Sequence, residues 1–248
     1  MGSGLRTWEV RLGIILVLLS VVIYTAKYLL LGDPGNTYQY ILNALGFLPI
    51  NVLFVTLIIN ELLSIRAKRE RLEKLNMVIG AFFSEVGNEL LVFLSYHDPD
   101  LPGIRQDLIV TKTWRPERFS TVRDLLQHHR YDVAIDAPDL ERLCRHLVGR
   151  RDFLLRLLEN PVLLEHEAFT DLLRATFHLT EELERREDFA GLPESDIRHL
   201  KDDIGRVYRL LTAQWLDYME YLKRNYPYLF SLAMRSNPFD EAASPIVR

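Results

Sequence analysis

Histidine and carboxylate side chains are the first candidates for chemistry in this sequence of 248 residues. The chain contains seven histidines and 34 acidic residues, which is enough to build a metal site between helices. A four-helix di-iron site, however, requires Glu-x-x-His on two helices with further glutamates opposite. The sequence contains no Glu-x-x-His, and neither His128-His129 nor His166 has a second ligand at matching spacing. We therefore expect no metal and no other cofactor.

Cys144 is the sole cysteine and therefore the sole thiol nucleophile. It lies in a helical pattern, residues 140–147, where a small packing residue is the ordinary interpretation. A single cysteine also excludes an intrachain disulfide and is typical of a reducing compartment. A phosphate-binding Gly-x-x-x-x-Gly-Lys run is absent. Because no nucleophile–base pair, nucleotide loop or metal set can be assembled, we expect a protein that is not an enzyme.

Cationic residues are not concentrated as they are in nucleic-acid-binding domains. The formal net charge is −4, whereas such domains are usually basic. Arg145, Arg150, Arg151 and Arg156 could form a local basic patch, but arginines spread along a helix are usually solvated and paired locally. We expect no nucleic-acid partner. Phosphate or lipid-headgroup binding at these four arginines is a minor alternative.

Thr56, Asn60 and Ser64 form a polar stripe within an otherwise apolar stretch. They recur every four residues and therefore share one face of a helix. An amide inside a bilayer costs free energy unless it has a partner, so Asn60 should face another helix or water. The favoured interpretation is an interhelical hydrogen bond in a bundle or oligomer. The alternative is a pore lined by this stripe, although no recognisable filter sequence accompanies it.

Two apolar stretches near the N-terminus predict membrane-spanning helices. Residues 12–31 have Lys27 as their only charge, and at 1.5 Å per residue they just cross a hydrocarbon core of about 30 Å. Residues 41–63 are almost free of charge, and Pro49 should bend or begin this helix near its outer end. A cleaved signal peptide is the rival interpretation of the first stretch, but Tyr24 stands where a cleavage site requires a small residue.

Flanking cations predict the orientation of the two spans. Cytosolic flanks of membrane helices are enriched in Lys and Arg. Here cations precede the first span and follow the second, whereas residues 32–40 between them have none. We therefore expect a multi-pass protein of the inner (plasma) membrane, in contact with membrane lipid, with both termini cytosolic. The flanking cations are Arg6, Arg11, Arg66, Lys68, Arg69, Arg71 and Lys74.

Residues 64–97 are expected to continue the second span as a membrane-proximal amphipathic helix. Apolar residues recur there in steps of three and four over nearly three heptads, continuing at Glu89 or Leu90 and then at Phe93. This face could meet later helices of the same chain or its own copy in a homo-oligomer. We prefer the oligomer, because two spans alone bury Asn60 poorly. The packing face comprises Leu72, Leu75, Ile79, Gly80, Phe82, Val86 and Gly87.

Residues 98–248 are expected to form a cytosolic helical domain. Turn-rich breaks separate its apolar patterns, Asp136 is a candidate N-cap, and the brief run 131–135 is interpreted as a loop. The fold class is therefore all-α, a two-helix transmembrane hairpin that continues into a cytosolic multi-helix bundle. The helices expected in this domain cover residues 103–112, 116–130, 137–158, 162–187, 194–224 and 227–235.

The chain ends in an aromatic-rich tail, residues 226–239. This tail could dock on the helical body, dock on the inner membrane surface, or present a helix to a partner. Two short spans, a cytosolic helical body and this tail together resemble an uncharacterised family of prokaryotic two-span membrane proteins with a cytosolic helical domain. The resemblance implies no known activity.

These patterns lead to two functional hypotheses and one domain layout. We expect a non-enzymatic integral membrane protein whose cytosolic helical module self-associates or binds a protein partner. The alternative is a small oligomeric channel with the second span lining the pore. The expected layout is a cytosolic N-terminus at 1–11, spans at 12–31 and 41–63 around an external loop at 32–40, a membrane-proximal helix at 64–97 and the cytosolic domain at 98–248.

Overall fold

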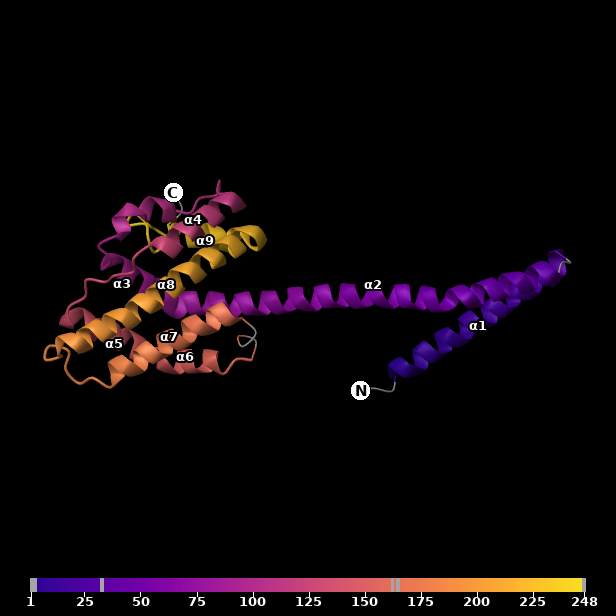
Figure 1. Ribbon diagram of the computed structural model, residues 1–248, viewed down its shortest axis with the longest axis horizontal. Coiled ribbons are helices and arrows are strands. Elements are labelled where there is room, and N and C mark those ends of the chain that lie inside the picture. The colour runs from indigo at the N-terminus through magenta and orange to yellow at the C-terminus, as the bar shows by residue number, and fades with distance from the viewer. Residues whose placement is uncertain (1–3, 32–33, 162, 164–165, 247–248) are drawn as a thin grey trace. The chain divides into compact units, whose positions relative to one another are not determined.

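The computed structural model describes residues 4–31, 34–161, 163 and 166–246. Within these residues the chain forms helices joined by turns and loops, and no strand (Figure 1). The all-α prediction is therefore confirmed. The chain divides into two compact units, Met1–Lys68 and Arg69–Arg248. The second unit thus begins well before residue 98, where the sequence patterns placed the start of the cytosolic domain.

The first unit contains α1 (Gly4–Leu31) and the beginning of α2 (Pro34–Phe82), a helix of 49 residues. α2 starts earlier than expected, because proline at the first helical position has a preset φ angle and needs no hydrogen-bond partner for its nitrogen. Pro49 lies inside the helix and does not begin it.

Exposed apolar side chains are the main feature of the first unit. Among the described residues, α2 is the one helix long and apolar enough to cross a membrane, with a mean hydropathy of 2.1 over an 18-residue window and none of that window buried. The stretch described on α1, Val17–Leu29, is apolar but shorter. Length and composition therefore support one candidate span, and the two-span hairpin stays a prediction.

A π-helical turn interrupts the expected amphipathic helix. It covers Phe83–Gly87 and separates α2 from α3 (Asn88–Tyr96). A π turn holds one residue more than an α turn, so the buried face moves forward by one position. Leu90 and Leu94 continue that face and are buried, whereas Phe93 is half-buried. Of the two continuations predicted before Phe93, Leu90 is the buried one, and Phe93 packs against the core at its edge.

The second unit is built around α8 (Glu194–Asn225), which has 32 residues. It packs against α7 (Glu167–Glu184), α4 (Pro116–His128), α9 (Pro227–Arg235) and α3 (Figure 1). Its apolar side chains recur at helical spacing, so one continuous stripe faces these neighbours. The buried side chains of that stripe include Leu200, Ile204, Val207, Tyr208, Leu211, Trp215, Leu216, Met219 and Leu222.

The helix expected over residues 137–158 is two helices, α5 (Ala137–Gly149) and α6 (Arg151–Leu158). The glycine at the end of α5 disfavours continuation of the helix. The N-terminus of α5 agrees with the sequence prediction. Asp136 accepts a hydrogen bond from the Asp139 amide at 3.0 Å, and the Asp139 carboxylate accepts one from the Asp136 amide, which forms a capping box.

The helix predicted at residues 103–112 is absent. The structure has short 3₁₀ turns there, at Leu101–Gly103 and Arg105–Leu108. Pro102 and the glycine after it explain the difference, because proline lacks an amide donor and glycine disfavours the helix. Residues 131–135 form a loop, as expected.

The helix expected over residues 162–187 starts later, at α7. Residues 162, 164 and 165 lie outside the described residues. The His166 ring accepts a hydrogen bond from the Phe169 amide at 3.2 Å, and this cap sets the start of the helix. The expected helices at 116–130, 194–224 and 227–235 agree with α4, α8 and α9 to within two residues.

The aromatic tail docks on the body, which is one of the three roles expected for it. Phe230 on α9 and Phe239 beyond it are buried, and the Phe239 ring meets Trp215 edge to face at 4.9 Å. Asn237 is also buried and donates a hydrogen bond to the Leu108 carbonyl at 2.9 Å. One outward face of α9 is nevertheless left exposed.

Candidate functional site

The polar stripe predicted in the second span lies on the apolar part of α2. Thr56, Asn60 and Ser64 are all exposed. Asn60 is exposed on the helix, so the described structure leaves its amide on the surface of α2. The structure therefore places the stripe on one helix face and does not pair it with another element.

The predicted packing face lies inside the second unit. Leu75, Ile79, Phe82, Val86 and Gly87 are buried, Gly80 is half-buried and Leu72 is exposed. The Phe82 ring meets Phe169 of α7 edge to face at 5.3 Å. Contact within one chain, one of the two alternatives left by the sequence, therefore accounts for the burial of this face.

Gly80 faces α8 at close range. A Cβ atom placed at Gly80 would lie 2.6 Å from the hydroxyl oxygen of Tyr218, which is well inside van der Waals contact. The Tyr218 ring is held from the other side, because it stacks on Phe83 at 5.3 Å. The glycine predicted to permit close approach of a helix does so, and the helix is α8 of the same chain.

A groove of about 590 Å³ lies between α3 and α5, a size that fits a small molecule or a peptide side chain. Its apolar part combines buried leucines with the exposed side chains Val92 and Tyr96. We define the α3–α5 groove by its lining residues Glu89, Leu90, Val92, Phe93, Tyr96, His97, Arg142, Leu143, Arg145 and His146.

Two guanidinium groups, those of Arg142 and Arg145, line the α3–α5 groove. Arg142 lies over the Phe93 ring at 5.8 Å, and within the described residues neither Arg142 nor Arg145 forms an ion pair. Burial lowers the pKa of His146 from its ordinary value, which favours the neutral ring. Glu89, the acidic residue of the lining, lies 3.4 Å from His146. The groove therefore offers an apolar floor with two guanidinium groups beside it, a combination suited to an apolar group next to a carboxylate.

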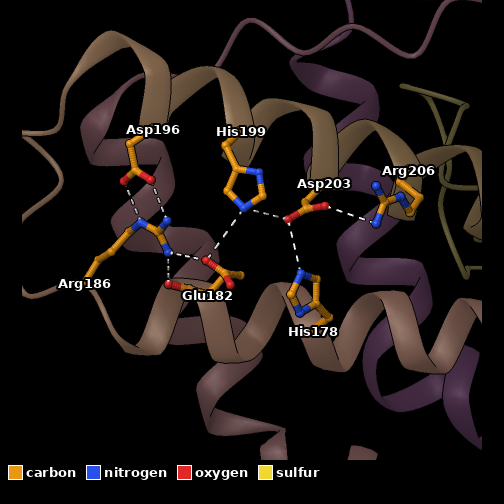
Figure 2. A network of polar contacts seen from close by, with 7 residues as sticks. All are labelled: His178, Glu182, Arg186, Asp196, His199, Asp203 and Arg206. Atoms are coloured by element: carbon orange, nitrogen blue, oxygen red, sulfur yellow. Dashed lines mark hydrogen bonds and ion pairs between the residues drawn. The ribbon is translucent and has the colours of Figure 1, made fainter.

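A separate network of charged residues joins α7 to α8, and Figure 2 shows its seven residues. At one end Arg186 donates two hydrogen bonds to Asp196, at 2.7 and 2.8 Å, and one to Glu182 at 2.8 Å. These bonds are the main cause of the lowered pKa values of Asp196 and Glu182. Arg186 therefore ties the last turn of α7 to the first turn of α8.

At the other end of the network, Asp203 lies between two histidines (Figure 2). Its side chain is 5% exposed, and its Oδ2 atom is 3.5 Å from Nε2 of both His178 and His199. Arg206 approaches the other carboxylate oxygen at 3.3 Å. In the described part of the chain, no group of three or more His, Cys, Asp or Glu is arranged to hold a metal ion. The arrangement is an electrostatic contact between two helices.

A third polar cluster is buried where the loop after α3 meets α4 and α8. The Asp98 carboxylate accepts hydrogen bonds from the amides of Asp100 and Leu101, at 2.8 and 3.1 Å. It also lies 2.8 Å from Nε2 of His129. Burial, and then the nearby Asp98, raise the pKa of Tyr208. Each carboxylate oxygen has a partner, so this cluster stabilises the loop and leaves no open position for a ligand.

These clusters were not predicted from the sequence. The signal for the α7–α8 network was the i, i+4 spacing of His178 with Glu182 and of His199 with Asp203, which places each pair on one helix face. The α3–α5 groove could not be read from spacing, because the π turn sets which side of α3 faces α5.

Comparison with known proteins is consistent with this architecture. Residues 71–235 match the family described as Uncharacterized protein MJ1433, C-terminal helical domain, and residues 4–63 match MJ1433, N-terminal helical domain. Uncharacterized protein MJ1433 of Methanocaldococcus jannaschii is 47% identical over 235 residues, covering 95% of this chain and 94% of the relative. The chain belongs to the MJ1433 family. No solved structure matches it.

The two MJ1433 family domains agree with the two compact units. The gap between the matched ranges, from residue 63 to residue 71, contains the division after Lys68. The expected helical domain is therefore supported by both the family and the structure. The MJ1433 descriptions name helical domains and state neither a membrane location nor an activity.

Proposed function

We propose that this chain is a membrane-anchored, non-catalytic binding module, in which the second unit presents the α3–α5 groove to a protein partner. The exposed apolar part of α2 is the observation that carries this proposal. None of its most apolar window is buried, and a contiguous apolar surface of this length is unfavourable in water. A bilayer covers such a helix and leaves its backbone hydrogen bonds intact.

The expected orientation follows from charge. Lys and Arg before the first apolar stretch and after the second put both termini in the cytosol. Reporter fusions after Arg11 and after Lys74 should give cytosolic signals, and a tag at residue 36 should be accessible from outside. Carbonate washing should leave the full chain in the membrane fraction. An external signal after Lys74, or release by carbonate, would contradict the membrane anchorage.

The partner that fits the α3–α5 groove is a protein segment with an aromatic or aliphatic side chain beside Asp or Glu. The exposed Tyr96 and Val92 offer apolar contact, and Arg142 and Arg145 offer positive charge. A carboxylate between two guanidinium groups gains charge-assisted hydrogen bonds that a neutral segment lacks. The groove is therefore proposed as a site for an acidic segment with an apolar anchor.

This specificity can be tested by selecting displayed random peptides on the full chain held in lipid nanodiscs. Peptides with an aromatic residue next to Asp or Glu should be enriched. Exchanging Arg142 and Arg145 for Glu should abolish that enrichment by reversing the charge. Arg156→Glu is the matched control, because Arg156 is exposed on the neighbouring α6 and does not line the groove. If the native chain, the variant with Glu at 142 and 145, and Arg156→Glu all enrich the same peptides equally, the groove is not the binding site.

A channel is the second candidate function, and the exposed Asn60 amide on an apolar helix favours it. Several copies of α2 around an axis would give the stripe Thr56, Asn60 and Ser64 a polar environment. Liposomes containing the full chain would then conduct ions, and Asn60→Leu would remove the conductance. If α2 only anchors the module, the liposomes stay tight, and the mass of the purified particle reports whether the chain self-associates.

A further inference from the structure

α9 is apolar on both of its faces. Phe230 points into the body and is 4% exposed, whereas Tyr228, Leu229 and Leu232 are 71%, 38% and 47% exposed. Leu232 lies four residues after Tyr228 and three after Leu229, so the three exposed side chains share the outward face of the helix. A helix that is apolar all round is normally covered on both sides.

The beginning of α9 lies at the end of the second unit where α2 enters it. Tyr226, the residue before α9, lines a groove of about 740 Å³ together with Arg69 and Leu72 of α2. Arg69 follows Leu63, the end of the predicted span, by six residues, which is about 9 Å of helix. The outward face of α9 therefore starts close to the point at which the chain would leave a membrane.

Positive charge surrounds this point. Residues 66–74 contain five cationic and two acidic residues, and Arg224 lines the same groove as Tyr226. Three carboxylates also line it, and each has a cationic partner: Glu73 lies 3.4 Å from Arg69, and Arg123 donates hydrogen bonds to Asp217 and Glu220, at 2.7 and 2.9 Å. The surroundings of α9 are thus complementary to anionic lipid headgroups.

We propose that the outward face of α9 rests in the headgroup region of an anionic membrane, the same membrane that holds α2. This inference rests on the membrane anchorage proposed above. A tyrosine next to leucines suits the boundary between hydrocarbon and water, because the ring is apolar and its hydroxyl is polar. A second copy of the chain is a poorer occupant, since three side chains fall far short of the roughly 800 Å² per partner in a stable interface.

The test uses the full chain in nanodiscs containing one anionic lipid, phosphatidylglycerol, and a Cys144→Ser background. Single cysteines at Leu229, Leu232, Leu155 and Leu57 carry a nitroxide, and its collision rates with oxygen and with a water-soluble nickel complex report immersion. Leu155 on α6 is the matched control, because it is 38% exposed, like Leu229. Leu57 reports independently whether α2 lies in the bilayer.

The inference expects labels at 229 and 232 to collide several times more often with oxygen relative to nickel than the label at 155. It also expects this difference to shrink in nanodiscs of neutral lipid. If the label at 57 is immersed while the labels at 229 and 232 behave like the label at 155, α9 does not touch the membrane. The proposed contact of α9 then fails, and the membrane anchorage stands. Spin–spin broadening at 229 would show a second copy on this face and would also overturn it. A water-exposed label at 57 would overturn the membrane anchorage and this inference together.

Discussion

Arg186 shows how one side chain holds two helices of this molecule together. Its guanidinium bonds two carboxylates on different helices, Glu182 on α7 and Asp196 on α8. The fork shape allows both oxygens of Asp196 to accept. A lysine at this position would offer a point charge and would lose the paired geometry.

Replacing Arg186 by Met should lower stability by about 1 kcal/mol at pH 7, because the hydrogen bonds to Glu182 and Asp196 are lost. The effect should depend on pH. The folded-state pKa values of both carboxyls are lowered, so their contribution is present above the ordinary values of 4.5 and 3.8 and is lost as the pH falls through the folded values. Thermal melts should show a difference in Tm that shrinks between pH 6 and about pH 3. A constant difference would refute this assignment.

His129 should matter for stability through its contact with the buried Asp98. Removing its ring by His129→Ala leaves one oxygen of the fully buried Asp98 carboxylate without its histidine partner, a loss of about 1–3 kcal/mol. The adjacent His128 is exposed, so His128→Ala should change stability by less than about 0.5 kcal/mol. Thermal melts of both variants check the prediction, and equal effects would count against the buried pair.

At the scale of elements, the contact of α2 with α8 depends on the absence of a side chain. Alanine is about 1 kcal/mol more favourable than glycine inside a helix, but a Cβ at Gly80 would meet the Tyr218 hydroxyl at 2.6 Å. Gly80→Ala should therefore give no gain in the native chain and a gain of about 1 kcal/mol in a Tyr218→Phe background. Thermal melts of the native chain, the two single variants and the double variant in one detergent give the coupling free energy between the two positions. Equal changes in Tm in both backgrounds would show that the contact is not limiting.

Local chemistry explains which elements could be predicted. The capping box at Asp136 and the apolar stripe of α8 are encoded by neighbouring residues, so the sequence predicts them well. The break after Gly149 and the π turn at Phe83–Gly87 could not be predicted in this way. A buried helix can tolerate a glycine, and a π turn has no distinctive residue type. The α3–α5 groove depends on that turn and on packing across a long sequence separation, and therefore could not be predicted.

At the scale of the whole molecule, the end of α2 belongs to the core of the second unit. A fragment of residues 69–248 should fold and melt cooperatively, whereas residues 98–248 should be helical but lack a cooperative transition. The shorter fragment loses side chains that each contribute about 1.5–3 kcal/mol of burial, against a total stability of about 5–15 kcal/mol. Circular dichroism and near-ultraviolet spectra distinguish the two fragments. The lost side chains include Phe82, Phe83, Val86, Leu90, Leu91 and Leu94.

Identical cooperative melting of the two fragments would contradict this division and would make residue 98 the true boundary of the domain. The expected result would explain why the match to the C-terminal family begins at residue 71. The family's unit of folding would then include the end of α2, so that the exposed apolar part of α2 and the second unit share one continuous helix backbone.

The π turn also fixes the phase of everything that follows it. In a regular α-helix an inserted residue would rotate everything after it by about 100° about the helix axis. The wider π turn absorbs the extra residue and keeps Leu90 and Leu94 on the buried face. Deleting the exposed Ser84 should therefore convert the π turn into a regular α turn and leave the same side of α3 facing α5. A relative with a one-residue gap between 83 and 87 should keep both the fold and the surface that α3 offers to a partner.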